Sequence, residues 1–284
     1  MQGRIIKQIS NDYSVELSST EIVICKARGK FRKMNISPLV GDIVEIDYDN
    51  RYILDINERK NELIRPTIAN IDQAVIITSV HIPNFSSNLL DKLLVTIEYN
   101  NVKPIICFTK LDLIDNEYRK EIDFYINYYR KIGYEVYLNT DEEIRKIFKD
   151  KVTVFAGQSG AGKSTLLNRL DSNLNLATGE VSNALGRGKH TTRHVELIPL
   201  LGGLVADTPG FSSLDFNGMT KEDIRDNFIE FNKYRDNCLY SDCMHIKEDN
   251  CSIKEMVNNR TIINSRYDNY LKFISDKEKE NNRY

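Results

Sequence analysis

Residues 152–165 read VTVFAGQSGAGKST, and this stretch decides the fold. Apolar residues at its start predict a buried strand, and the residues after Gly162 predict the beginning of a helix. The spacing Gly157-x-x-x-x-Gly162-Lys163-Ser164 is that of the P-loop, and the strand–turn–helix context makes the match specific. The glycines let successive backbone N–H groups point at one anion, and the helix N-terminus adds partial positive charge. The stretch therefore predicts a nucleoside-triphosphate site rather than a turn that binds no ligand.

The phosphate-binding residues are predicted to be the loop and the start of the helix. Lys163 is expected to reach the β- and γ-phosphates, and the Ser164 hydroxyl is expected to ligate Mg²⁺. The full predicted set is Gly157, Gln158, Ser159, Gly160, Ala161, Gly162, Lys163, Ser164 and Thr165.

Composition is that of an ordinary globular protein. The chain has 284 residues, of which 41% are hydrophobic and 28% charged, and its formal net charge is −2. A charge so close to zero excludes a general basic field for nucleic acid, so any such surface must be a local patch. Because no apolar run is long enough to span a bilayer and the N-terminus leads into a strand, we expect a cytoplasmic protein without a membrane partner. We also expect a monomer.

The N-terminal region, residues 1–64, is predicted to form a small β-barrel of the oligonucleotide-binding (OB) type. Short apolar strands alternate there with polar turns. Between the third and fourth strands, Lys26–Lys33 reads KARGKFRK, five cations around Phe31. Such a loop can follow a nucleic-acid backbone and stack a base on the aromatic ring. A solvated run of charges is the alternative.

The middle region, residues 65–215, alternates helical segments with apolar strands, which predicts a parallel sheet with right-handed crossovers. Two further motifs end predicted strands in this region. Asp207-Thr208-Pro209-Gly210 follows one of them, so the Asp207 carboxylate can hold Mg²⁺ through water and the Gly210 N–H can meet the γ-phosphate. Without a P-loop the same four residues would equally fit a plain turn.

The second motif, Thr109-Lys110-Leu111-Asp112, ends a strand that precedes the P-loop in the chain. A carboxylate at Asp112 can accept hydrogen bonds from the N1–H and the exocyclic amine of guanine, donors that adenine does not present in that arrangement. The site is therefore predicted to bind a guanine nucleotide, with Thr109 and Lys110 beside it. A polar strand end without a ligand is the alternative.

The order of these motifs is reversed relative to ordinary GTPases, in which the P-loop comes first and the base-reading motif last. In this order, and in several further segments, the chain resembles the circularly permuted, ribosome-small-subunit-dependent GTPases of the RsgA family (also YjeQ or YloQ). The matching segments are Gly29-Lys30-Phe31-Arg32, Val40-Gly41-Asp42, Arg65-Pro66, Ala69-Asn70-Ile71-Asp72-Gln73, Leu89-Leu90-Asp91-Lys92, Ala156–Leu167, Gly188-Lys189-His190-Thr191-Thr192-Arg193 and the C-terminal cysteines.

The resemblance implies a cytoplasmic hydrolase that converts GTP to GDP and phosphate with Mg²⁺. It also implies a late assembly factor that binds the 30S ribosomal subunit and its 16S rRNA and is stimulated by the subunit. Two departures from the family pattern are visible. Thr109 stands where the base-reading motif usually has Asn, and residues 137–140 (YLNT) lack the usual Ser-Ala dipeptide, so Asn139 and Thr140 are expected to supply backbone contacts instead.

Hydrolysis is predicted to be slow without a partner. Phe211 occupies the position where many GTPases place a water-orienting glutamine, and a phenyl ring cannot polarise water. His190 matches the histidine proposed as catalytic in the family, with a phosphate or RNA contact as the alternative role. Thr191 or Thr192 is expected to ligate Mg²⁺ with Ser164 and Asp207, and we favour Thr192.

The C-terminal region, residues 216–284, is predicted to be a helical zinc-binding domain. Cys238-x₄-Cys243-x-His245-x₅-Cys251 offers three thiolates and one imidazole, a closed Cys₃His set suited to one structural Zn²⁺. Cysteines buried for packing are the alternative, although this polar segment has little apolar core of its own. Cys25 and Cys107 lie in apolar strands and are expected to be core residues.

The sequence thus predicts a multidomain α/β protein: an OB-type barrel, a circularly permuted P-loop GTPase domain and a helical zinc domain. Two other functional classes compete with an RNA-stimulated GTPase. One is an ATPase or kinase, against which Asp112 argues; the other is a non-enzymatic RNA-binding module that uses GTP only as a conformational ligand.

Overall fold

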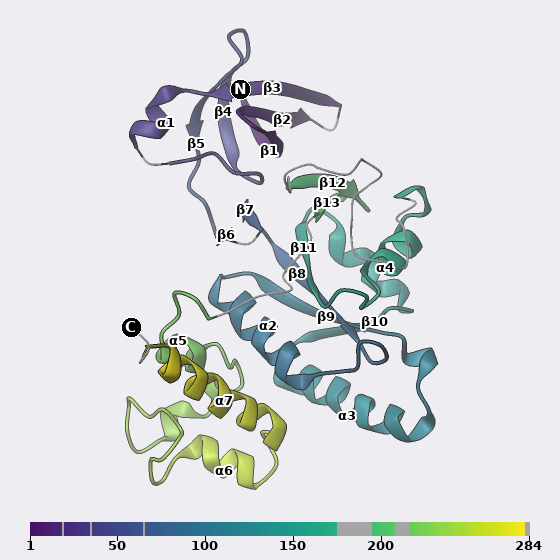
Figure 1. Ribbon diagram of the computed structural model, residues 1–284, viewed down its shortest axis with the longest axis vertical. Coiled ribbons are helices and arrows are strands. Elements are labelled where there is room, and N and C mark those ends of the chain that lie inside the picture. The colour runs from purple at the N-terminus through teal and green to yellow at the C-terminus, as the bar shows by residue number, and fades with distance from the viewer. Residues whose placement is uncertain (19, 35, 65, 175–194, 208–215, 282–284) are drawn as a thin grey trace.

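The computed structural model (Figure 1) describes residues 1–18, 20–34, 36–64, 66–174, 195–207 and 216–281. A barrel at one end, a central sheet with helices on both faces and a helical C-terminal part follow one another along the long axis. The predicted architecture is confirmed. None of the helices within these described ranges is long and apolar enough to cross a membrane.

The barrel is closed by strand pairing at both ends of its sequence. Strand β1 pairs with both β2 and β4, and β3 pairs with β5. Alternate residues point inward, and Ile5, Val15, Val44 and Ile53 are completely buried. The elements are β1 (Gln2–Ile9), β2 (Asp12–Ser18), β3 (Glu21–Ala27), α1 (Gly29–Lys33), β4 (Ile43–Asp47) and β5 (Tyr52–Ile56).

The basic segment after β3 differs from the prediction. It is not a loop, because residues 29–33 form the short helix α1, and Phe31 is only 4% exposed and belongs to the barrel core. The apolar ring is more stable in the core than in water, so the helix turns it inward, while Lys26, Arg28 and Lys30 face solvent. The prediction that Phe31 stacks a base is therefore wrong.

A short hairpin joins the barrel to the central sheet: β6 (Glu62–Ile64) and β7 (Thr67–Ala69). The buried Asn61 side chain closes the junction, donating to the Ile71 carbonyl at 2.8 Å and accepting from the Ile71 N–H at 2.8 Å. The apolar core continues across the junction, since Ile5 of the barrel, Leu197 and Val152 belong to one cluster.

The central sheet has five parallel strands in the order β10-β9-β8-β11-β13, and the antiparallel β12 lies between β13 and β1 of the barrel. Its faces are covered by different helices. Ala74 and Ile76 of β8 pack in the cluster that includes residues of α2 and α3, whereas Val75 and Ile77 pack with α4. The elements are β8 (Gln73–Ser79), α2 (Ser87–Tyr99), β9 (Lys103–Thr109), α3 (Asn116–Ile132), β10 (Glu135–Leu138), β11 (Val152–Gly157), α4 (Lys163–Leu170), β12 (Glu196–Leu200) and β13 (Gly203–Asp207).

The C-terminal part packs on α2 (Figure 1) through α5 (Lys221–Asp226) and α7 (Asn264–Asn281), with α6 (Ser252–Asn258) between them in sequence. A buried ionic network holds it there. Arg266 of α7 donates to Asp91 of α2 at 2.7 Å and to Glu230 at 2.7 Å, and all three side chains are at most 2% exposed. Tyr129 and Asn269 also donate to Asp91, each at 2.6 Å.

We expect Arg266→Met to lower stability strongly, because it leaves two carboxylates buried without their cation. Removing one partner of a buried ion pair costs about 3–5 kcal/mol. The control is Lys221→Ala, which breaks an exposed pair with Glu278 and should cost less than about 1 kcal/mol. Urea unfolding followed by circular dichroism measures both, and similar midpoints for the two variants would contradict this role of Arg266.

Candidate active site and metal centre

The predicted phosphate loop adopts at three positions a left-handed backbone conformation that favours glycine. Gly157, Gly160 and Gly162 have φ angles of +127°, +76° and +105°, and α4 begins directly after them at Lys163. A Cβ on Gly157 would lie 2.3 Å from the Ile77 carbonyl oxygen of β8. The loop therefore turns sharply directly before the helix N-terminus, where backbone N–H groups can bind a phosphate.

The predicted base-reading segment holds this loop directly. The buried Thr109 hydroxyl donates to the Ala161 carbonyl at 2.6 Å, so it braces the loop as the family's Asn was expected to. The Lys110 ammonium donates to the Gly160 carbonyl at 2.8 Å and also to that of Ile82. Asp112 lies exposed in the turn that follows. The structure thus brings together two motifs that lie about fifty residues apart in the chain.

Of the remaining predicted ligands, Asp207, Asn139 and Thr140 lie at the same edge of the sheet. Strand β13 runs parallel to β11, with Thr153 opposite Val205, and Asp207 is its last residue. Asn139 and Thr140 follow β10, and the Asn139 N–H donates to the Phe108 carbonyl at 2.8 Å. His190, Thr191, Thr192, Gly210 and Phe211 lie outside the described residues. Because parallel strands share one carboxyl edge, this edge is where a nucleotide would bind.

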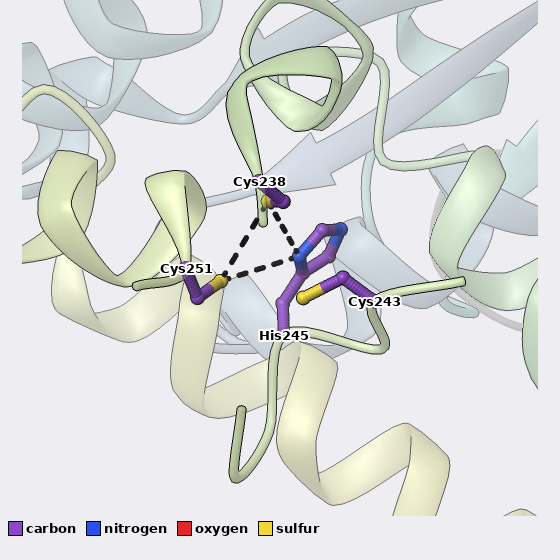
Figure 2. A group of neighbouring side chains, drawn as sticks. All are labelled: Cys238, Cys243, His245 and Cys251. Atoms are coloured by element: carbon purple, nitrogen blue, oxygen red, sulfur yellow. Dashed lines mark hydrogen bonds between the residues drawn. The ribbon is translucent and has the colours of Figure 1, made fainter. Parts of the chain in front are cut away.

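The four predicted metal ligands converge in the C-terminal part. Figure 2 shows the His245 ring facing the cysteines, with Nδ1 at 3.6 Å from the Cys238 Sγ and 3.3 Å from the Cys251 Sγ. The two sulfurs are 4.0 Å apart, and one ligand atom from each of the four residues lies within 4.8 Å of the others. No other such group occurs among the residues that the structure describes.

This donor set fits zinc. With Zn–S of about 2.3 Å and Zn–N of about 2.0 Å, tetrahedral ligand atoms lie about 3.5–3.8 Å apart, close to the separations seen. Burial lowers the pKa of His245 to about 4, so its imidazole is neutral at pH 7 and can offer a lone pair to a cation. Burial also raises the pKa of the Cys243 thiol to about 12. A bound cation would favour the thiolate and reverse that shift.

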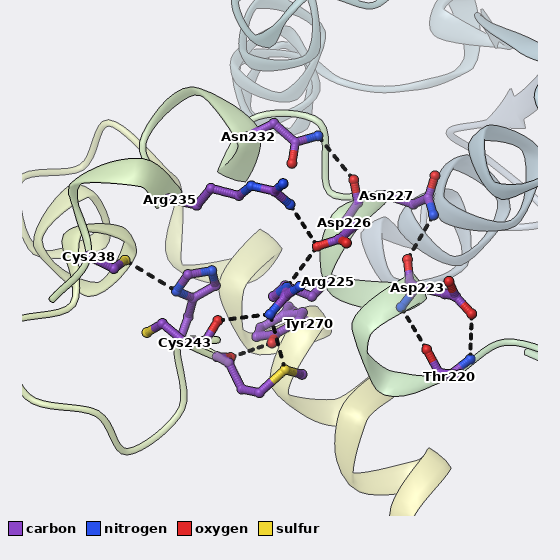
Figure 3. Close-up of polar contacts among 12 residues, drawn as sticks. Thr220, Asp223, Arg225, Asp226, Asn227, Asn232, Arg235, Cys238, Cys243 and Tyr270 are labelled. Carbon is purple, nitrogen blue, oxygen red and sulfur yellow. Dashed lines mark hydrogen bonds and ion pairs between the residues drawn. The ribbon is translucent and has the colours of Figure 1, made fainter. Parts of the chain in front are cut away.

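Polar contacts fix the backbone that carries these ligands (Figure 3). Arg225 donates to the Cys243 carbonyl at 3.2 Å and is itself held by Asp226 at 2.7 Å. Tyr267 donates to the His245 carbonyl at 2.6 Å. Glu248 accepts from the N–H groups of Met244, Ile246 and Lys247 at 2.7–2.9 Å. The ligand turn is therefore held in place by Arg225 of α5, by Tyr267 of α7 and by the Glu248 carboxylate within the turn.

Sequence reasoning missed the aromatic rings that the barrel exposes. Tyr48 and Tyr52 are 38% and 40% exposed, and each has an arginine over its ring, Arg51 at 4.8 Å and Arg28 at 5.9 Å. The only sequence signal for exposed rings was position: Tyr48 directly follows β4 and Tyr52 begins β5, so the two rings flank the turn between these strands. In OB barrels this turn and the neighbouring strand face are common nucleic-acid contacts.

Comparison with known proteins gives consistent matches along the chain. Residues 2–52 match the model of the RsgA N-terminal domain, and residues 56–217 match that of the RsgA GTPase. The small ribosomal subunit biogenesis GTPase RsgA 2 of Oceanobacillus iheyensis is 48% identical, over 100% of this chain and 99% of that protein. The small ribosomal subunit biogenesis GTPase RsgA of Latilactobacillus sakei is 49% identical over 96% and 95%.

Two solved structures share the fold. The crystal structure of YloQ, a circularly permuted GTPase, aligns with a TM-score of 0.84 at 42% identity and covers 98% of this chain and 95% of its own. The crystal structure of YjeQ from Thermotoga maritima aligns with a TM-score of 0.84 at 33% identity, with 97% and 98% coverage.

The base prediction is tested at Asp112. We expect Asp112→Asn to lose GTP affinity roughly 10- to 100-fold, because a charged acceptor for two donors is removed. The same variant should gain affinity for xanthosine triphosphate, whose donor and acceptor pattern is exchanged. Asp123→Asn on α3 is the matched control and should bind both nucleotides as the wild type does. Unchanged GTP binding by Asp112→Asn would refute the assignment of guanine to this residue.

The metal prediction is tested at Cys243. Protein purified without added metal should carry about one zinc per chain. Cys243→Ser should release the metal and unfold the ligand turn locally, since a structural site contributes its binding energy to folding. Cys25→Ser, in the barrel, should keep the metal. Elemental analysis with limited proteolysis distinguishes these outcomes, and a folded, metal-free C-terminal part in the wild type would contradict the prediction.

Proposed function

This chain belongs to the RsgA GTPase family and is a GTP hydrolase, and we propose that it serves in the biogenesis of the small (30S) ribosomal subunit as a late assembly factor. The main structural support for this proposal is the contact of Thr109 and Lys110 with the phosphate loop. These contacts join the base-reading segment to the loop although the two motifs stand in the permuted order in the chain. An ATPase or kinase has no need of the Asp112 carboxylate at that position. The relatives' names supply the subunit as the partner.

We propose the following roles at the phosphate end of the site. Lys163 neutralises the β- and γ-phosphates, and Ser164, Thr192 and Asp207 hold Mg²⁺ directly or through water. The loop N–H groups from Gly157 to Thr165 bind the phosphate oxygens. When bound, Mg²⁺ supplies charge neutralisation of the phosphates, while the chain positions the nucleotide.

The proposed catalytic histidine is His190. With a phenyl ring at position 211, basal hydrolysis is slow, and the bound subunit supplies or positions the group that orients water. The sequence order places His190 and the Mg²⁺-binding threonine in one segment before β12. Binding of the γ-phosphate can therefore act on both at once.

The proposed partner surface is the barrel. Lys26, Arg28 and Lys30 face solvent around α1 and contact phosphates of 16S rRNA, and the exposed rings of Tyr48 and Tyr52 stack bases. With the small subunit as its partner, the protein is proposed to act in the cytoplasm as a monomer with one structural Zn²⁺. The proposed domains are residues 1–64, 65–215 and 216–284.

Binding to purified small subunits tests the proposal. Lys26→Ala, Arg28→Ala and Lys30→Ala combined should weaken retention, and the slope of log affinity against log salt should fall by about 2 to 3, since each lost phosphate contact contributes about 0.7–0.9. The control combines Lys120→Ala, Lys131→Ala and Lys149→Ala, which remove the same charge from exposed positions of the central part.

The bound nucleotide should also determine how strongly the protein is retained on small subunits. A non-hydrolysable GTP analogue should favour the bound state and GDP the released one, because a switch requires different affinities for its two states. Equal retention with both nucleotides, or equal binding to large subunits, would contradict the proposed function. An equal loss in both triple variants would show that net charge, not the barrel, holds the particle.

A further inference from the structure

One strand of the barrel is also a strand of the nucleotide-binding sheet. Strand β1 pairs antiparallel with β12, with Lys7 opposite Glu196, so the barrel and the central part form one continuous sheet (Figure 1). The Lys7 ammonium donates to the Glu196 carboxylate at 2.7 Å. The two side chains are only 25% and 38% exposed, so solvent screens this pair less than a free surface pair.

Glu196 lies between Lys7 and Asp207 in that sheet. It is the first residue of β12, and its partner on the other side is Asp207, the last residue of β13. In the sequence, Thr192 lies just before Glu196, and Gly210 lies just after Asp207. Lys7, Glu196 and Asp207 are therefore consecutive partners in a row across three strands, which runs from the barrel to the residue proposed to hold Mg²⁺.

We infer that Lys7 is a positioning residue for GTP hydrolysis: through its ion pair with Glu196, the barrel sets the position of β12 and so of the strand end at Asp207. The inference rests on the proposed function, because it explains how a particle bound on the barrel reaches the hydrolysis site. A closed barrel moves as a unit, and β1 is the strand through which it pairs with the central sheet. Lys7 itself contacts no predicted nucleotide ligand in the described chain.

Neutral substitutions of the pair test this. Lys7→Gln and Glu196→Gln should each lower the ratio of subunit-stimulated to basal turnover about two- to fivefold, the scale of one partly exposed ion pair. The loss should fall on kcat, with KM for GTP and binding to small subunits unchanged. The charge-swapped variant, Lys7→Glu with Glu196→Lys, should recover most of the ratio, which a merely disruptive effect would not allow.

A matched control lies at the opposite edge of the same sheet. Lys103 of β9 and Glu135 of β10 form another cross-strand ion pair, on strands separated from β12 by β8, β11 and β13. Lys103→Gln and Glu135→Gln should leave the ratio unchanged. A wild-type ratio in the Lys7 and Glu196 variants would overturn the inference. A loss of small-subunit binding in parallel with the loss of turnover would also overturn it, because the ion pair would then be needed for binding and not for hydrolysis. Wild-type turnover that small subunits do not stimulate would contradict the proposed function, and the inference would fall with it.

Discussion

The close approach of β11 to β8 at Gly157 is the constraint on which the nucleotide site depends. The Ile77 carbonyl occupies the space that a Cβ would need, so the chain can turn into the phosphate loop there only without a side chain. After this turn, α4 begins at Lys163 and packs on the sheet through Leu166, Leu167 and Leu170. Thr109 and Lys110 of the next segment then hold the loop from the side. A larger residue at 157 would push β11 from β8 and disturb both contacts.

Chain order matters little to such a site, because five parallel strands end at one edge whatever their sequence order. Permutation does change what the ends of the domain are attached to. The segment after Asp207 leads to the C-terminal part, and there Lys277 of α7 donates to the Phe216 carbonyl at 3.0 Å. The buried Arg266 network fixes that part to α2, while β1 fixes the barrel to β12. In the chain, β12 follows residues 175–194 and Phe216 follows residues 208–215, so each neighbouring part is attached next to a segment that carries predicted γ-phosphate or Mg²⁺ ligands.

The sequence predicted what local spacing determines. The P-loop and the Cys₃His set depend on residues a few positions apart, and the structure brings each set together. Sequence reasoning missed the helix at 29–33, because five cations masked the single buried ring of Phe31. It also missed the Asp91–Arg266 and Lys7–Glu196 pairs, which join residues 175 and 189 positions apart, since nothing in either segment indicates its partner. The roles of His190 and Thr192 stay predictions.

GTP turnover measured with no ribosomal particle, with small subunits and with large subunits tests the central claim most directly. Because Phe211 replaces the usual water-orienting glutamine and the barrel is proposed to bind the small subunit, the protein should turn over GTP slowly alone and with large subunits. Small subunits should raise its rate, and Lys163→Ala should abolish turnover under all three conditions. The same rate under all three conditions in the wild type would contradict the account.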